Sequence, residues 1–239
     1  MTQAIDIGAR LQIIRSTLPP SICLVAVSKF HPVEMLEEAY RCGQRDFGES
    51  RVQELLVKRQ ALPNDVKWHF IGHLQTNKVR QIVPFIHLIH SIDSTRLLDE
   101  IERQAVLCGR TKIDVLLEVH VAQEESKSGF TPDELLSLIQ THNLSQRWSH
   151  IHFRGLMGMA TFTQDEDQIA AEFRKIVSLM QEVVQRFEEC EELYQFDILS
   201  FGMSEDYPIA IAEGSNMLRL GSAIFGTRVP VSATSSPTK

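Results

Sequence analysis

Short apolar runs and longer amphipathic segments alternate along the whole chain. Runs of four to ten residues that are rich in β-branched and aromatic side chains are typical of buried strands. Eight such runs predict strands at 22–30, 45–48, 68–72, 88–92, 114–121, 151–160, 196–202 and 217–226. The pattern therefore predicts eight strands that are separated from one another by other elements.

The segments between these runs have the three- and four-residue spacing of amphipathic helices. The clearest is 165–189, where Ile169, Phe173, Ile176 and Met180 recur at that spacing. Ser94 and Thr131 stand where N-caps are expected, and Thr131 is followed by Pro132 and by Glu134 at the capping-box position. The other predicted helices are 1–15, 32–42, 50–61, 76–83, 94–108 and 131–142.

Strict alternation of strand and helix predicts parallel strands joined by helical crossovers. Eight units of about 30 residues match an α/β fold of the closed (β/α)8 TIM-barrel type, here with an extra N-terminal helix. An open doubly wound sheet is the alternative, but no glycine-rich dinucleotide fingerprint follows the first strand. We expect one domain over 1–228 and a disordered tail over 229–239.

Composition and charge narrow the possible partners. The longest unbroken apolar run, 22–27, is too short to cross a membrane, and the formal charge of -7 argues against nucleic-acid binding. The four cysteines form no CxxC pair, so we expect reduced thiols in a cytoplasmic protein. We also expect a monomer and no metal site. The pairs His69/His73 and His87/His90 are not accompanied by a carboxylate or a third ligand at the sequence spacing that is typical of metal sites.

In a barrel of this type, the active site lies where the strands end at the carboxyl-terminal face. The first predicted strand ends in Val27-Ser28-Lys29. Lys29 has two interpretations: a rim lysine whose stem packs while its amine reaches water, or a desolvated amine that forms a Schiff base with a carbonyl.

Small and polar residues follow the seventh strand and lie in the eighth. Backbone N–H groups after these two strands commonly bind phosphate in barrels, although ordinary turns have similar compositions. A phosphate site opposite a Schiff-base lysine would suit a phosphorylated aldehyde, of which pyridoxal 5'-phosphate (PLP) is the obvious example. The candidate phosphate residues are Ser200, Gly202, Ser204, Gly221 and Ser222.

Seven motifs in order resemble the pyridoxal phosphate homeostasis protein family over about residues 20–228. They are the segments 27–29, 47–54, 68–78, 124–130, 155–157, 200–206 and 219–226. The resemblance implies a fold similar to the barrel domain of alanine racemase (PLP fold type III), with PLP held by Lys29 as an aldimine. It implies that Arg219 lies beside the pyridine nitrogen and that Met203 joins the phosphate residues named above. Ser50 and Met157, from two other motifs, complete the expected cofactor-binding set.

The chain departs from the family pattern at four positions. The family usually has Asn at the positions of Ser50 and His120, Thr at that of Asn216, and often Met at that of Phe201. Ser50 and His120 would lie at the barrel mouth, so the groups that flank the cofactor ring are expected to differ.

The expected function is to hold and donate PLP in vitamin B6 and amino-acid homeostasis, without an established reaction. Arginine only donates hydrogen bonds, so Arg219 would face an unprotonated ring nitrogen, which weakens the cofactor as an electron sink. None of Tyr40, Tyr194 and Tyr207 is an evident acid or base for racemisation, although Tyr207, just after the phosphate loop, could approach the site. A small fold-type III amino-acid racemase and a PLP-independent phosphate-binding enzyme are the alternatives. Apo PLP-dependent enzymes that receive the cofactor are candidate partners. The segment 124–127 is either a lid over the barrel mouth or a surface loop.

Overall fold

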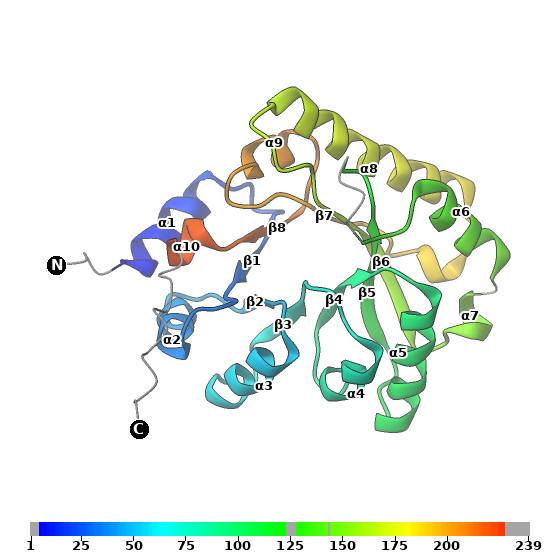
Figure 1. Ribbon diagram of the computed structural model, residues 1–239, viewed down its shortest axis with the longest axis horizontal. Coiled ribbons are helices and arrows are strands. Elements are labelled where there is room, and N and C mark those ends of the chain that lie inside the picture. Colours follow the sequence, from blue (N-terminus) through cyan, green and yellow to red (C-terminus); the bar gives the residue numbers. More distant parts are fainter. Residues whose placement is uncertain (1–4, 123–127, 143, 228–239) are drawn as a thin grey trace, which may run out of the picture.

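The computed structural model describes residues 5–122, 128–142 and 144–227. Eight parallel strands form a closed barrel in sequence order, and pairing of the first strand with the eighth closes it (Figure 1). The strands are β1 (Cys23–Val27), β2 (Asp46–Glu49), β3 (Lys67–Phe70), β4 (Leu88–Ile92), β5 (Ile113–Val119), β6 (Ile151–Gly158), β7 (Ile198–Ser200) and β8 (Met217–Leu220).

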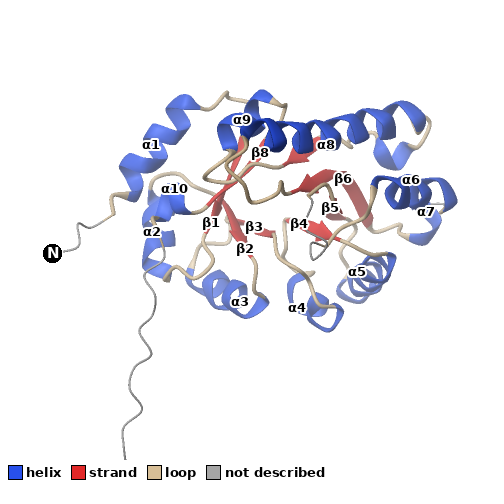
Figure 2. Cartoon of the chain, turned by 45° about the horizontal axis from the view of Figure 1, so that its top comes forward, coloured by secondary structure: helices blue, strands red, loops and turns tan. Residues whose placement is uncertain are grey.

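Helices surround the strands on the outside of the barrel (Figure 2). The α-helices are α1 (Ile7–Thr17), α2 (Val33–Arg41), α3 (Val52–Ala61), α4 (Val79–Ile82), α5 (Thr95–Cys108), α6 (Pro132–Thr141), α7 (Leu144–Arg147), α8 (Glu166–Arg186), α9 (Tyr207–Ala212) and α10 (Ser222–Phe225). Two 3-10 turns, η1 (Thr76–Lys78) and η2 (Glu191–Leu193), complete the described elements. The first and last helices meet, since Arg10 Nη1 donates to the Ser222 carbonyl at 3.2 Å.

The structure confirms the closed barrel and all eight strands in the predicted order. It also confirms the predicted helix starts, because Ser94 caps α5 and Thr131 forms a full capping box with Glu134. The extension of the last strand to residue 226 is wrong, because β8 ends at Leu220 and the next residues form α10. Helices α7 and α9 were not predicted, since neither is long enough to show a helical period.

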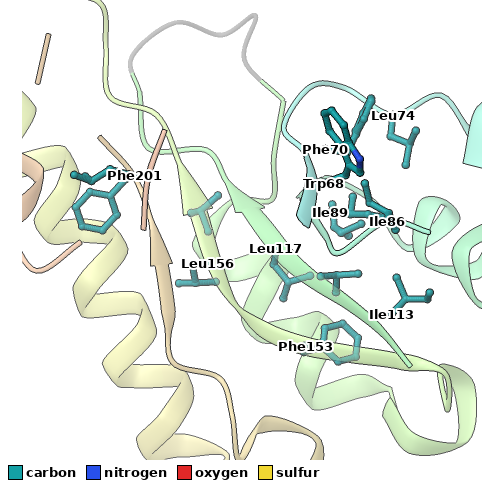
Figure 3. Close-up of a cluster of buried hydrophobic side chains, with 14 of the residues drawn as sticks. Trp68, Phe70, Leu74, Ile86, Ile89, Ile113, Leu117, Phe153, Leu156 and Phe201 are labelled. Carbon is teal, nitrogen blue, oxygen red and sulfur yellow. The ribbon is translucent and has the colours of Figure 1, made fainter. Parts of the chain in front are cut away.

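Two hydrophobic layers stabilise the barrel. The larger one lies between the outer face of the strands and the helices, and Figure 3 shows part of it, with Trp68 and Phe70 on β3 and Phe153 on β6. Burying side chains of this size contributes roughly 2 kcal/mol each. The smaller layer fills the barrel interior with Val25, Leu88, Leu116, Met157 and Met217.

Two predicted segments fall outside the described residues: the loop 124–127 and the tail 229–239. Among the helices that are described, none has the length and apolar character needed to span a membrane.

Candidate functional site

A cavity of about 470 Å³ opens at the mouth of the barrel, where β1, β6 and β8 end. Its volume is within the range of small-molecule and cofactor sites. Six residues of the predicted cofactor-binding set line it: Lys29, Met203, Ser204, Arg219, Gly221 and Ser222. The structure therefore brings together the end of the first strand and the loops after the last two.

Lys29 enters this cavity from a segment that is fixed on both sides. The hydroxyl of the preceding Ser28 donates to Glu49 Oε1 at 2.6 Å, and the Ser28 carbonyl accepts from Lys58 Nζ at 2.8 Å. The backbone N–H of the following Phe30 donates to Glu54 Oε2 at 2.8 Å. Side chains of β2 and α3 thus set the position of the Lys29 backbone.

Phe30 adopts a backbone φ of 67°, a left-handed conformation that is uncommon for a residue other than glycine. The Arg51 guanidinium lies over its ring, 4.6 Å from the centroid. This conformation turns the chain sharply after Lys29, so that β1 ends at the cavity.

Glu49 and Lys58 form a buried ion pair below this segment, with Lys58 Nζ 2.7 Å from Glu49 Oε1. Burial raises the pKa of Glu49, while the Lys58 ammonium and the Ser28 hydroxyl oppose that rise. Glu49 Oε2 is buried without a hydrogen-bond partner among the described residues. The pair is therefore a costly polar contact that specifies the position of the β1 end.

The loop after β7 and the turn after β8 meet through Ser204. Its Oγ accepts from the backbone N–H of Gly221 at 3.2 Å and from that of Ala223 at 3.1 Å. Two backbone N–H groups thus converge on one oxygen at the start of α10. Such convergent donors suit an anion's oxygen as well as a hydroxyl. The loop itself is tied by the Met203 N–H, which donates to Asp206 Oδ1 at 2.5 Å.

Arg219 lines the cavity from β8, although its side chain is almost completely buried. Its Nη1 donates to the carbonyl and the hydroxyl of Ser200, and its Nη2 donates to the Gly158 carbonyl at 3.0 Å. Burial lowers the pKa of Arg219 to about 10, against the opposing charges of Glu118 and Asp206. The guanidinium therefore stays protonated at neutral pH and is held by β6 and β7.

Four residues of the predicted set do not line the cavity. Ser200 is buried behind Arg219, and Met157 belongs to the apolar interior of the barrel. Gly202 has a φ of +99°, and a Cβ there would lie 2.5 Å from that of Ala210. Ser50 follows β2 and packs against Gly72. Gly202 and Ser200 shape the site from behind, whereas Ser50 and Met157 lie outside its wall.

Several lining residues were missed by the sequence reasoning. His31 lies after Lys29, and Met159 and Thr161 follow β6. Met159 was detectable, because side chains alternate along a strand and it is two residues beyond the inward-facing Met157. Glu118 of β5 does not line this cavity, but a carboxylate within a largely apolar strand is unusual and was detectable in the sequence. Its side chain is buried and accepts from Ser128 Oγ at 2.9 Å.

A chain of polar side chains crosses the barrel interior below the cavity. Asp46 Oδ1 lies 3.1 Å from His69 Nε2, and His69 Nδ1 lies 2.9 Å from His90 Nε2. His90 Nδ1 in turn lies 3.1 Å from Ser200 Oγ, which Arg219 also contacts. Burial, followed by the charges of neighbouring side chains, lowers the pKa of His90 well below its usual value.

The structure overturns the expectation that no carboxylate joins these histidines. Asp46, His69 and His87 come together although they are far apart in the sequence, because β2, β3 and β4 are neighbours in the barrel. His69 and His73 do not pair with each other, in line with the rejection of that pair above. His73 is exposed and bonds to Asp93 instead.

The departures from the family pattern occupy different surroundings. Asn216 is remote from the cavity lining and holds the start of β7, since its side chain accepts from the Leu199 N–H and donates to the Asp197 carbonyl. Phe201 is buried against Phe173 with ring centroids 4.6 Å apart. His120 Nε2 lies 3.0 Å from the Ala122 carbonyl, after β5.

The chain is similar to known proteins over most of its length. The alanine racemase N-terminal domain family matches residues 5–229. The pyridoxal phosphate homeostasis protein of Aquifex aeolicus is 37% identical over 206 residues, which cover 86% of each chain. This chain belongs to the pyridoxal phosphate homeostasis protein family. The human protein of that name is 36% identical over 214 residues, which cover 86% of this chain and 76% of the human one.

Solved structures of this family have the same fold. PipY of Synechococcus elongatus, determined without PLP, is 39% identical and superimposes with a TM-score of 0.83 over 92% of this chain and 100% of PipY. PipY with PLP bound is 38% identical, with a TM-score of 0.81 over the same shares. Alanine racemase of Clostridium difficile is only 16% identical, with a TM-score of 0.69 over 93% of this chain and 56% of that enzyme, so it shows the fold alone.

Proposed function

We propose that this protein binds PLP in the cavity at the barrel mouth and acts in intracellular PLP homeostasis by holding and releasing the cofactor. The observation that carries this proposal is the meeting of the Lys29 side chain with the oxygen-binding turn of Gly221 and Ala223 in one cavity. PLP carries an aldehyde, which a lysine amine can bind, and a phosphate, whose oxygens can accept from the converging backbone N–H groups of the turn. The PipY structure with PLP bound supports the assignment.

Each residue of the predicted set has a place in this proposal. Lys29 holds the aldehyde, while the backbone and side chains of Met203, Ser204, Gly221 and Ser222 hold the phosphate. Gly202 allows the turn of the loop after β7, and Ser200 holds the Arg219 side chain from behind. Ser50 and Met157 lie outside the cavity wall, at a greater distance from the cofactor. When bound, PLP supplies an electrophilic carbonyl and an electron-accepting ring.

Arg219 limits the chemistry that the site can support. A guanidinium can only donate, so a ring nitrogen that contacts it must be unprotonated and draws electrons less strongly. Arg219 is already bonded to Ser200 and Gly158, which keeps it in place. We therefore propose a cofactor carrier rather than an efficient enzyme, with apo PLP-dependent enzymes as recipients.

The tyrosines support the same proposal. Tyr40 donates to Asp65 Oδ1 on the outside of the barrel, and Tyr194 is 73% exposed. Tyr207 begins α9 beside the phosphate loop, but it is not part of the cavity lining. Racemisation needs an acid or base on each face of the substrate, and no tyrosine is placed to supply one.

A PLP titration followed by visible absorbance tests binding. Wild type should develop the band of a lysine-bound cofactor at one equivalent, and Lys29→Ala should not. Lys78→Ala, a lysine on η1 outside the cavity lining, is the matched control and should behave as wild type. An unchanged band in Lys29→Ala would contradict the proposal.

Proton exchange tests the absence of efficient catalysis. The PLP-loaded protein is incubated with single L-amino acids in deuterated water, and α-proton exchange is followed by NMR. We expect no exchange at useful turnover. Exchange over many turnovers would favour the fold-type III racemase alternative.

A further inference from the structure

Asp46, His69 and His87 form a cluster at the amino-terminal end of the barrel, opposite the cavity. Asp46 is the first residue of β2, His69 lies in β3, and His87 immediately precedes β4. Their candidate ligand atoms all lie within 4.8 Å of one another. Parallel strands that start at one end of a barrel bring these residues together without any motif in the sequence.

We propose that Asp46, His69 and His87 bind one divalent transition-metal ion of the Zn²⁺ class. Two imidazoles and one carboxylate are a common protein ligand set for zinc, and a water molecule completes the coordination in many such sites. The ion can reach the cluster from solvent, because His87 is exposed and the Asp46 side chain is 21% exposed.

Other charged and polar groups face the cluster from neighbouring elements. Lys67, at the start of β3, is a cation near the cluster and opposes binding, and Asp114 on β5 is a nearby carboxylate. The Cys23 thiol, from β1, faces Asp46. Burial and Asp46 together raise the pKa of that thiol to about 12. Asp114 is itself paired with Arg154 at 3.1 Å and with His152 at 2.9 Å.

The hydrogen bond at the second ring nitrogen of His69 is typical of a metal-bound histidine. Such a histidine usually gives its second ring N–H to a further acceptor, which fixes its tautomer. His69 Nδ1 lies 2.9 Å from His90 Nε2, so it has an acceptor already in place. His90 then continues to Ser200, and Ser200 contacts Arg219 in the cavity wall.

Metal binding would reverse the direction of these hydrogen bonds. Without metal and with one proton on each ring, His69 Nε2–H donates to Asp46, His90 Nε2–H donates to His69, and the Ser200 hydroxyl donates to His90. With metal on His69 Nε2, each ring keeps its one proton, now on Nδ1, so that His69 donates to His90 and His90 to Ser200. No proton is gained or lost, and the Ser200 hydroxyl turns away from His90.

Zinc competition against a chromophoric chelator tests the site on the full chain. Wild type should bind one Zn²⁺, and His87→Ala and Asp46→Asn should each weaken that binding roughly tenfold or more. His87 is exposed, so its replacement leaves the core intact. The matched control is His73→Ala, which removes another exposed histidine bonded to a carboxylate, Asp93, and should bind as wild type. Absence of stoichiometric binding to wild type, or wild-type affinity in both cluster variants, would overturn the proposal.

Two readouts separate this inference from the proposed function. Zinc binding should be the same in Lys29→Ala as in wild type, because the cluster lies at the other end of the barrel. Long-range ¹H–¹⁵N spectra should show the His69 and His90 protons on Nε2 without zinc and on Nδ1 with it. Unchanged tautomers at saturating zinc would place the ion elsewhere and refute the assignment of His69 as a ligand.

Discussion

Arg219 Nη1 donates to both the carbonyl and the hydroxyl of Ser200, at 2.6 and 2.7 Å. One guanidinium nitrogen thus joins the end of β7 to β8, while Nη2 reaches the Gly158 carbonyl at the end of β6. The arginine is positioned by the barrel itself, so it need not reorganise when a ligand enters. Preorganisation of this kind lowers the cost of binding.

We expect Arg219→Lys to lower the free energy of unfolding by about 2 to 4 kcal/mol, because one ammonium group replaces a planar fork and leaves buried carbonyls unpaired. Urea unfolding measures the loss. Arg186→Lys, which is exposed and contacts Gln140, should stay within roughly 0.5 kcal/mol of wild type. A loss in Arg219→Lys no larger than in this control would contradict the assigned contacts.

Lys58→Met should destabilise the protein by about 3 kcal/mol, since it leaves the buried Glu49 carboxylate without its cation. The double variant Glu49→Gln/Lys58→Met should recover part of that loss, because no uncompensated charge remains. Unfolding of Lys58→Met, Glu49→Gln and the double variant measures this coupling. Arg103→Met, which breaks an exposed pair with Glu100, is the control and should change the free energy of unfolding far less than Lys58→Met does. Additive effects of the two buried substitutions would count against the pair.

Glu118→Gln should change the pH dependence of stability. Burial raises the pKa of Glu118, so the folded protein holds that proton more tightly than the unfolded chain does. Its contribution to stability is therefore complete below the ordinary pKa and is lost as the pH rises through the raised value. Relative to wild type, the free energy of unfolding of Glu118→Gln should increase from a pH near 4.5 to neutral pH.

Glu134→Gln is the control, because its effect on the pH dependence of stability should have the opposite sign. Hydrogen bonds from Thr131 lower the pKa of Glu134, so its contribution to stability is present above the ordinary pKa and is lost on acidification. Relative to wild type, Glu134→Gln should lose stability as the pH rises from below the lowered pKa of Glu134 to its ordinary value near 4.5. A difference between Glu118→Gln and wild type that is independent of pH would mean that the Glu118 pKa is not raised.

We expect Gly202→Ala to lower the free energy of unfolding by more than about 2 kcal/mol, because it combines a left-handed backbone with a steric overlap. The φ is +99°, and the added Cβ would lie 2.5 Å from that of Ala210. Gly214→Ala is a close control, since its φ is +98° and no atom lies within 4 Å of the added Cβ. Thermal unfolding should show the larger loss in Gly202→Ala, and equal losses would exclude the overlap.

The sequence predicts the barrel well because its signals are local and repeated. Alternating strand and helix periods define eight units, and caps such as Ser94 and Thr131 mark helix starts by hydrogen bonds within one turn. The end of β8 was misplaced for a local reason too. Ile224 and Phe225 are apolar in either conformation, and only their packing outside the barrel shows that they are helical.

The wall of the site was predicted only in part, because loop ends and interior contacts depend on the closed barrel. Ser200 stands in a phosphate-loop motif, yet its hydroxyl is buried against Arg219 and His90. Asp46 and His87 are separated by 41 positions and meet only because β2, β3 and β4 are adjacent. Neither relationship has a signature in residue spacing.

The central claim is that Lys29 holds PLP, and borohydride reduction followed by peptide mapping tests it most directly. The protein is loaded with PLP, reduced, digested and examined by mass spectrometry. We predict that the added cofactor mass lies on the peptide that contains Lys29. Recovery of that mass chiefly on Lys78 or on Lys127 would contradict the account.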